Sequence, residues 1–307
     1  MSEVYPPVAG ESRGRLSSDP ARAEDSHDTP HAVWYLTGGA PGAHSGGSPV
    51  AVEKSASLVL RCQDWSETSQ VVHLLARDAG RFRCLAKGAK RPKNAFGGPL
   101  DRWTLGEAVF SLRDPNQLAV LMEFYETERF EGLRRRLDAY YAASLVTELV
   151  TGLTADLDPQ PEVFDLSVQT LGLLADAEDA ACRAVAYAFG WRLLGLLGYG
   201  PDMGHCVECR RPIEADRPVA FSAGLGGLVC QHCRPSAGLS AEAHWAKADA
   251  VALGPKALQA VRFLLGAPLD QLPRARLSEA TSREVRTALA RRVMELAGKE
   301  PLAAKYV

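Results

Sequence analysis

The sequence has no apolar run of 18 or more residues, the length that a helix needs to cross a membrane. Its N-terminus lacks a charged start followed by an apolar core, so we expect no secretory signal and no membrane attachment. An excess of one charge is missing too, because 35 basic residues stand against 37 acidic ones. A protein that is basic over its whole surface is therefore excluded, and any binding to nucleic acid has to come from a local patch.

Signatures of common catalytic sites are also missing. The chain has no G-x-x-x-x-G-K-[ST] loop for ATP, no nucleophile elbow and no recognisable cluster of metal-binding carboxylates. The glycine-rich stretch 38–45 lacks the lysine of a phosphate-binding loop, and no convincing strand precedes it. We therefore predict a protein without catalytic residues that is not an enzyme.

Four of the seven cysteines form two C-x-x-C pairs, with residues 210–229 between them: Cys206, Cys209, Cys230 and Cys233. A two-residue gap lets both sulfurs of a pair bind one ion, and the intervening length suits a hairpin that returns to it. Four thiolates close a tetrahedral shell and leave no open position for catalysis. The spacing therefore predicts a structural Zn²⁺ site.

Other interpretations of the cysteines are weaker. His205 and His232 flank the ligands and either could replace a cysteine, but the even spacing favours four thiolates. A zinc deaminase would need His-x-Glu and Pro-Cys-x-x-Cys, and a thioredoxin-type site needs only one C-x-x-C. The single residues Cys62, Cys84 and Cys182 are interpreted as small buried side chains, which places the protein in a reducing cytoplasm.

Composition and periodicity divide the chain into three parts. Residues 1–52 are rich in proline, glycine and serine without apolar periodicity, and we expect them to be disordered. Residues 53–135 contain five short strand-like runs, at 58–62, 71–75, 81–87, 105–112 and 118–124, with a hairpin turn at 113–116. This density of strands fits an OB-type β-barrel, although an SH3-like barrel would give a similar pattern.

Residues 136–307 have helical periodicity, most clearly at 137–149, 163–174 and 182–197 and from Pro255 onward. The stretch 281–284 has the Thr-x-x-Glu pattern of a capping box and is expected to start the last helix. The cysteine segment, 205–234, interrupts this region. We therefore predict an α+β protein with an N-terminal OB-type barrel and an α-helical domain that carries an inserted four-cysteine zinc knuckle.

The basic residues concentrate between Arg77 and Arg102, whereas 156–179 contains acidic residues only among its charged side chains. A flexible basic loop on a barrel, with aromatic residues nearby, is how OB folds hold single strands. The residues expected to contact DNA are Arg81, Arg83, Lys87, Lys90, Arg91, Lys93 and Arg102. The alternative is that these charges only solvate strand edges. The nearby Phe96 and Trp103 are each expected in the core.

From about Glu53 onward the chain resembles the RecO family of bacterial DNA-repair proteins. Residues 60–80, with WSETS leading into a valine pair, look like the family's opening hairpin, and KGAKRPK at 87–93 is similar to its basic KGARRPKS loop. LLGLLGYGP at 193–201 looks like its helix end, and the two cysteine pairs follow in the family's order. The first 52 residues have no counterpart in this pattern.

The resemblance implies an OB domain that binds single- and double-stranded DNA, and a role as a recombination mediator. Such a protein anneals complementary strands and helps RecA to replace single-strand-binding protein. Implied partners are RecR and the acidic, apolar-ended tail of single-strand-binding protein, in a bacterial cytoplasm at the nucleoid. The competing hypotheses are a nucleic-acid-processing enzyme with a zinc ribbon and an OB fold, and a scaffolding protein that binds no DNA.

Overall fold

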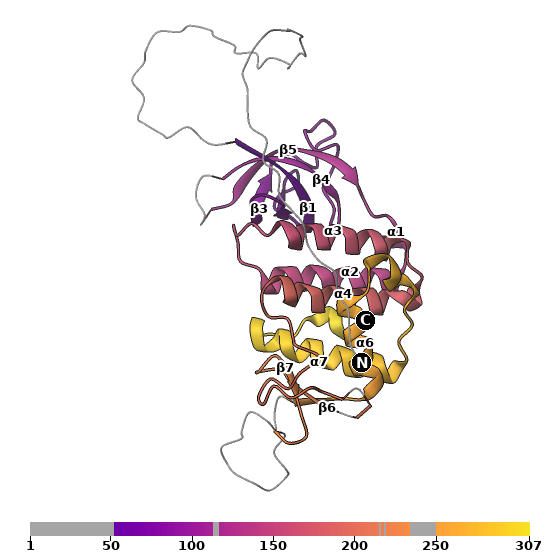
Figure 1. The fold of residues 1–307 in the computed structure, drawn as a ribbon. Coiled ribbons are helices and arrows are strands. Elements are labelled where there is room, and N and C mark those ends of the chain that lie inside the picture. The colour runs from indigo at the N-terminus through magenta and orange to yellow at the C-terminus, as the bar shows by residue number, and fades with distance from the viewer. Residues whose placement is uncertain (1–51, 113–116, 215, 218, 234–249) are drawn as a thin grey trace, which may run out of the picture. The chain divides into compact units, whose positions relative to one another are not determined.

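Five strands close into a barrel at the start of the described chain (Figure 1). The computed structural model describes residues 52–112, 117–214, 216–217, 219–233 and 250–307, so almost all of the expected disordered segment and the 113–116 turn lie outside the described residues. The strands are β1 (Val52–Asp64), β2 (Gln70–Ala76), β3 (Gly80–Ala86), β4 (Leu105–Ser111) and β5 (Ala119–Glu128). Their order is β1-β2-β3-β5-β4, with β3 and β5 parallel. This Greek-key closure confirms the predicted OB-type barrel.

Side chains along each strand point alternately into and out of the barrel, and the inward ones fill its core. Along β3, Phe82, Cys84 and Ala86 are buried inside, whereas Arg83 is exposed on the outer surface. Phe82 meets Phe110 of β4 with ring centroids 4.5 Å apart. In β1 the pattern is broken by an irregularity in its pairing with β2 between Val59 and Arg61. This β-bulge reverses the alternation, so Arg61 reaches the outer surface.

Helices follow the barrel: α1 (Gly132–Arg135), α2 (Leu137–Leu153), α3 (Pro161–Asp176), α4 (Asp179–Leu196), α6 (Pro255–Gly266) and α7 (Glu279–Ala297), with short 3₁₀ turns η1 (Leu269–Arg274) and η2 (Leu302–Lys305). The helix α4 packs against α2, α3, α6 and α7 and is buried on nearly all sides, including Tyr187, Phe189 and Trp191. A helix that is apolar all round belongs in the centre of a bundle. None of the described helices is long and apolar enough to span a bilayer.

A small sheet with the order β7-β6-β8 interrupts the helices, formed by β6 (Val219–Ser222), β7 (Gly227–Val229) and β8 (Ala250–Leu253). Strands β6 and β7 pair antiparallel between the two cysteine pairs, so the hairpin that suits this stretch of the sequence is present. Arg292 of α7 is buried beside this sheet and donates a hydrogen bond to the carbonyl oxygen of Ala223 at 2.8 Å. The sheet is thus fixed to the helical bundle.

The expected start of the last helix is wrong. Helix α7 begins at Glu279, and its N-cap is Ser278, whose hydroxyl accepts a hydrogen bond from the Thr281 backbone N–H at 3.2 Å. Glu284 is used elsewhere, because its carboxylate accepts the backbone N–H of Gly254 at 2.6 Å, just before α6. The capping-box pattern thus gave a helix near the right place but the wrong residue as its cap.

The barrel and the helices share one hydrophobic cluster. Leu58, Leu60, Leu75 and Trp103 of the barrel belong to the same buried cluster as the helical core. Trp103 has no exposed surface, and its indole N–H donates to the Thr147 hydroxyl of α2 at 2.9 Å. The prediction that Trp103 and Phe96 are core residues is therefore confirmed.

Ion pairs border this contact. Arg77 forms two hydrogen bonds with Asp165 of α3, at 3.0 and 2.9 Å, and Arg81 lies 2.9 Å from Asp156. The backbones of the barrel and of the segment before α3 come closest at Gly80, which has a φ of 73°. A Cβ atom there would lie 2.5 Å from the backbone oxygen of Asp158, so only glycine fits.

We predict that Gly80→Ala destabilises the protein far more than Gly97→Ala. Gly97 has a similar φ of 70°, but nothing lies within 4 Å of its would-be Cβ atom, so its substitution costs about 1 kcal/mol for the left-handed backbone alone. At Gly80 the collision with Asp158 adds about 1–3 kcal/mol. Urea unfolding of both variants measures the difference. Equal losses would contradict the close approach.

Candidate metal centre and nucleic-acid interface

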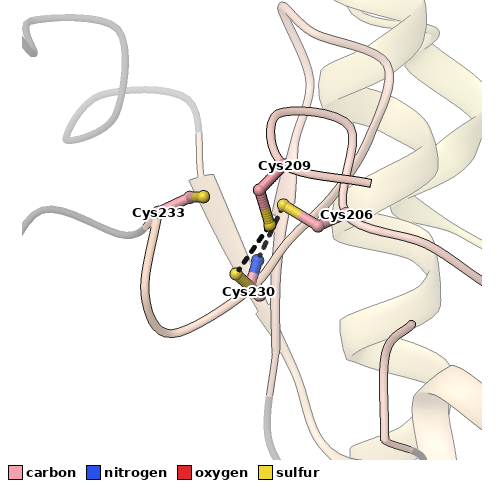
Figure 2. Close-up of side chains that lie close together, drawn as sticks. All are labelled: Cys206, Cys209, Cys230 and Cys233. Atoms are coloured by element: carbon pink, nitrogen blue, oxygen red, sulfur yellow. Dashed lines mark hydrogen bonds between the residues drawn. The ribbon is translucent and has the colours of Figure 1, made fainter. Parts of the chain in front are cut away.

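The four paired cysteines converge on one point beside the small sheet, as Figure 2 shows. Their sulfur atoms all lie within 4.8 Å of one another, and Cys209 Sγ is 3.6 Å from Cys230 Sγ. None of the four forms a disulfide. The sequence prediction of which cysteines come together is thus matched by a cluster that could hold a metal ion.

Local backbone contacts build this cluster. Cys206 donates its N–H to the Arg211 carbonyl at 2.9 Å, and Arg210, with a φ of 60°, donates back to the Cys206 carbonyl at 2.9 Å. The second pair is joined to the first because Val207 N–H bonds to the Leu228 carbonyl at 2.8 Å. Two tight turns are therefore held side by side, with their sulfurs facing one another (Figure 2).

The donor set fits a tetrahedral thiolate site. With metal–sulfur bonds of about 2.3 Å, tetrahedral sulfurs stand about 3.8 Å apart, close to the separation of Cys209 and Cys230. Burial opposes ionisation of Cys206, but hydrogen bonds from the backbone N–H groups of Cys209, Cys230 and Glu208 outweigh it and lower the pKa of the thiol to about 6. The backbone therefore favours the thiolate that a metal ion requires.

The flanking histidines and the single cysteines are not part of the cluster. His205 instead meets the Asp202 carboxylate through Nδ1 at 3.1 Å, and His232 is exposed. Burial raises the pKa of Cys62 to about 12 and that of Cys182 to about 11. Cys84 is fully buried, and its pKa is raised by the same effect. These three thiols remain protonated near neutral pH. Cys84 and Cys182 are buried as expected, whereas Cys62 is only half-buried.

The predicted DNA-contacting residues separate into two groups. Five of them are exposed and form no ion pair with a described residue: Arg83, Lys87, Arg91, Lys93 and Arg102. Lys90 lies among them in sequence, but its ammonium is 2.7 Å from the Asp64 carboxylate. The basic loop 87–93 therefore offers mostly unneutralised charge to solvent.

Two predicted residues are engaged elsewhere. The Arg81 side chain is only 16% exposed, because it pairs with Asp156 and donates to the Thr154 carbonyl at 2.9 Å. Arg102 places its guanidinium over the rings of Trp103 and Tyr140, at 5.3 and 5.4 Å from their centroids. The structure thus places Arg81 and Arg102 beside the helices, apart from the free charges of the loop.

The loop is positioned by the turn between β1 and β2. Lys90 N–H donates to the Thr68 carbonyl at 3.0 Å, and Gly88 N–H donates to the Ser69 hydroxyl at 3.1 Å. Further along, Phe96 is buried in the barrel core. The charged segment is therefore held at both ends against the same end of the barrel.

Sequence reasoning missed three residues on the outer barrel surface: Arg61, His73 and Trp65. Arg61 pairs across the sheet with His73, and His73 pairs with Arg83. Periodicity gives the faces of one strand at a time, but it does not give the register between strands or the bulge in β1. The exposed Trp65 next to the basic loop was the one available signal.

The fold and the site together define a class of protein in which an OB-type barrel with an exposed basic loop is joined to helices that carry a four-cysteine knuckle. Residues 51–126 match the family described as "Recombination protein O N terminal", and 134–304 match "Recombination protein O C terminal". The chain therefore belongs to the RecO family of DNA repair proteins. The resemblance drawn from the sequence is confirmed.

Two relatives illustrate the similarity. The DNA repair protein RecO of Rhodopirellula baltica is 37% identical over 64% of this chain and 72% of its own length. The protein of the same name from Desulforudis audaxviator is 31% identical over 80% of this chain and 92% of its own length.

We expect Cys206→Ser to abolish stoichiometric metal binding, because a neutral hydroxyl replaces the most buried thiolate donor. Elemental analysis of the native protein should find about one divalent ion per chain, and added Co²⁺ should give thiolate charge-transfer absorption. Cys182→Ala is the matched control, since it removes a thiol outside the cluster. Well-folded native protein without metal, or equal loss in both variants, would contradict the site.

Proposed function

We propose that this protein is a non-enzymatic recombination mediator that binds DNA through its barrel, anneals complementary single strands and helps RecA to load with RecR. The observation that carries this proposal is the row of unneutralised charges in loop 87–93, on an OB-type barrel of a DNA-repair family. Such charges release counterions from DNA and reduce the repulsion between two phosphate backbones. No bond has to be made or broken in this reaction.

The same family membership supports the finer assignments. We propose Zn²⁺ as the ion of the four-cysteine cluster, since four thiolates in a closed shell are typical of structural zinc. We propose single- and double-stranded DNA, RecR and the tail of single-strand-binding protein as partners, in the bacterial cytoplasm at the nucleoid. The domain limits proposed are 1–52, 53–135 and 136–307, with the knuckle at 205–234.

The proposed DNA contacts are the seven basic residues expected from the sequence, in unequal roles. Arg83, Lys87, Arg91 and Lys93 are free to meet phosphates, whereas Lys90 must first leave Asp64. Arg81 and Arg102 already have partners beside the helices, and we assign them a smaller share. Their ranking follows from the cost of breaking an existing contact to form a new one.

Replacing Lys87, Arg91 and Lys93 together by Gln should weaken binding to single-stranded DNA and reduce its salt dependence. Each lost phosphate contact lowers the slope of log K against log salt by about 0.7, so three contacts lower it by about 2. Fluorescence anisotropy at several salt concentrations measures this slope. The control replaces Lys54, Arg183 and Arg276, whose charges are paired with Glu107, Glu279 and Glu178. An unchanged slope in the loop variant would remove the loop from the interface.

Annealing of complementary oligonucleotides coated with single-strand-binding protein tests the function itself. We expect the native protein to accelerate annealing without ATP, and the triple loop variant to be at least about tenfold slower, because its weaker phosphate contacts lower the occupancy of both strands. Annealing at the spontaneous rate would refute the mediator function. Cleaved or modified strands would favour a nucleic-acid-processing enzyme instead.

A further inference from the structure

An open cleft of about 450 Å³ lies on the outer surface of the barrel, beyond the loop discussed above. Arg61, His73 and Arg83 line it as directly opposed residues of β1, β2 and β3. Neighbouring strands are about 4.8 Å apart, so the row spans roughly 10 Å across the sheet. The three basic side chains are therefore close enough to act on the same stretch of a bound chain.

The charges of this row are not satisfied by acidic residues. Neither Arg61 nor Arg83 forms an ion pair with any described residue. Within the described part of the chain, the partner of Arg61 is the neutral amide of Gln63, whose oxygen faces the guanidinium at 2.6 Å. Asp64 also lines the cleft, but Lys90 already neutralises it. An anion entering the cleft thus meets uncompensated positive charge.

The rim of the cleft suits a nucleobase. Trp65 lines it and is 66% exposed, whereas the other described tryptophans, Trp103 and Trp191, have no exposed surface. Leu118 lines the cleft as well and is partly exposed. Phosphate-binding cations next to an exposed aromatic ring are the combination that binds single-stranded nucleic acid. A free inorganic anion would use the cations but not the ring.

We propose that this cleft binds a single DNA strand, with its phosphates on Arg61, His73 and Arg83 and a base on Trp65, and that His73 takes up a proton as the strand binds. The inference rests on the proposed DNA-binding function and adds a second, proton-linked contact to that of loop 87–93. The cleft meets the loop at Asp64, which lines the one and pairs with Lys90 of the other.

The surroundings of His73 set the direction of the proton linkage. Burial lowers its pKa from the usual 6.5, and the positive charges of Arg61, Arg83 and Arg81 lower it further, against a small opposing effect of Asp156. A bound phosphate reverses this balance by placing negative charge beside the ring, so the pKa rises in the complex. Affinity therefore increases as pH falls through the pKa of the complex, and it levels off below that of the free protein.

The test measures binding of oligo(dT) between pH 5.5 and 8, because thymine does not titrate in this range. We expect affinity to rise by up to about tenfold per pH unit on acidification, the limit for uptake of one proton. His73→Gln should bind like the native protein at pH 8 and lose the pH dependence. Lys93→Gln is the matched control, because it should weaken binding at every pH while the dependence persists.

Two further arms identify the ligand. Trp65→Ala should weaken oligo(dT) binding about fivefold or more, and Trp65→Phe should restore most of it. The NMR titration of His73 should show a raised pKa with oligo(dT) but not with an equal concentration of inorganic phosphate. An equal shift with inorganic phosphate would make the cleft a simple anion site and overturn the assignment to a strand.

The outcomes separate this proposal from the proposed function. If Lys87, Arg91 and Lys93 matter while His73→Gln keeps the native pH dependence, the protein binds DNA but not through this cleft. If the native protein binds no oligo(dT) at any pH, both proposals fail. Circular dichroism of each variant over the same pH range checks that a loss of binding is not a loss of folding.

Discussion

The contact between the barrel and the helices decides which parts of the barrel remain available to a partner. Leu58, Leu60, Leu75 and Trp103 are buried in the same apolar cluster as the helices, so this side of β1 and β2 is closed. The ion pairs of Arg77 and Arg81 close its border. Among the described residues of the barrel, basic side chains without an ion pair remain on loop 87–93, on the surface around His73 and at Arg102. The packing of the barrel against the helices thus both joins the two domains and decides which basic side chains of the barrel stay exposed.

The four-cysteine cluster and the basic surface belong to different parts of the fold and have different roles. The cysteine turns are tied to β7 and, through Arg292 and the small sheet, to α7. Four thiolates around one ion would fill a tetrahedral shell and leave no open coordination position for a reaction. The knuckle therefore stabilises an insertion within the helices, while the electrostatic features belong to the barrel.

Much of this architecture could be predicted from the sequence, and the failures have physical causes. Short alternating runs gave the five strands, and the spacing of the cysteines gave the cluster, because both depend on local geometry. The cap of α7 was missed because Glu284 bonds to Gly254, a residue distant in sequence. Arg81 was expected on the surface because alternation along a strand shows only which way a side chain points. It does not show that Asp156, distant in sequence, lies beside Arg81 and pairs with it. The row of Arg61, His73 and Arg83 depends on register and on a bulge, which only pairing reveals.

The buried position of Trp103 also has a consequence for the folding of the chain during its synthesis. The strands that form the barrel precede all of the helices in sequence, and Trp103 finds its partner Thr147 only 44 residues later. If the barrel closes as soon as its strands have left the ribosome, then Leu58, Leu60, Leu75 and Trp103 face water until α2 follows. During that interval the nascent chain exposes an apolar surface that can aggregate with other chains. Slow translation through α2 would lengthen the interval, and a high density of nascent chains would increase the risk of aggregation.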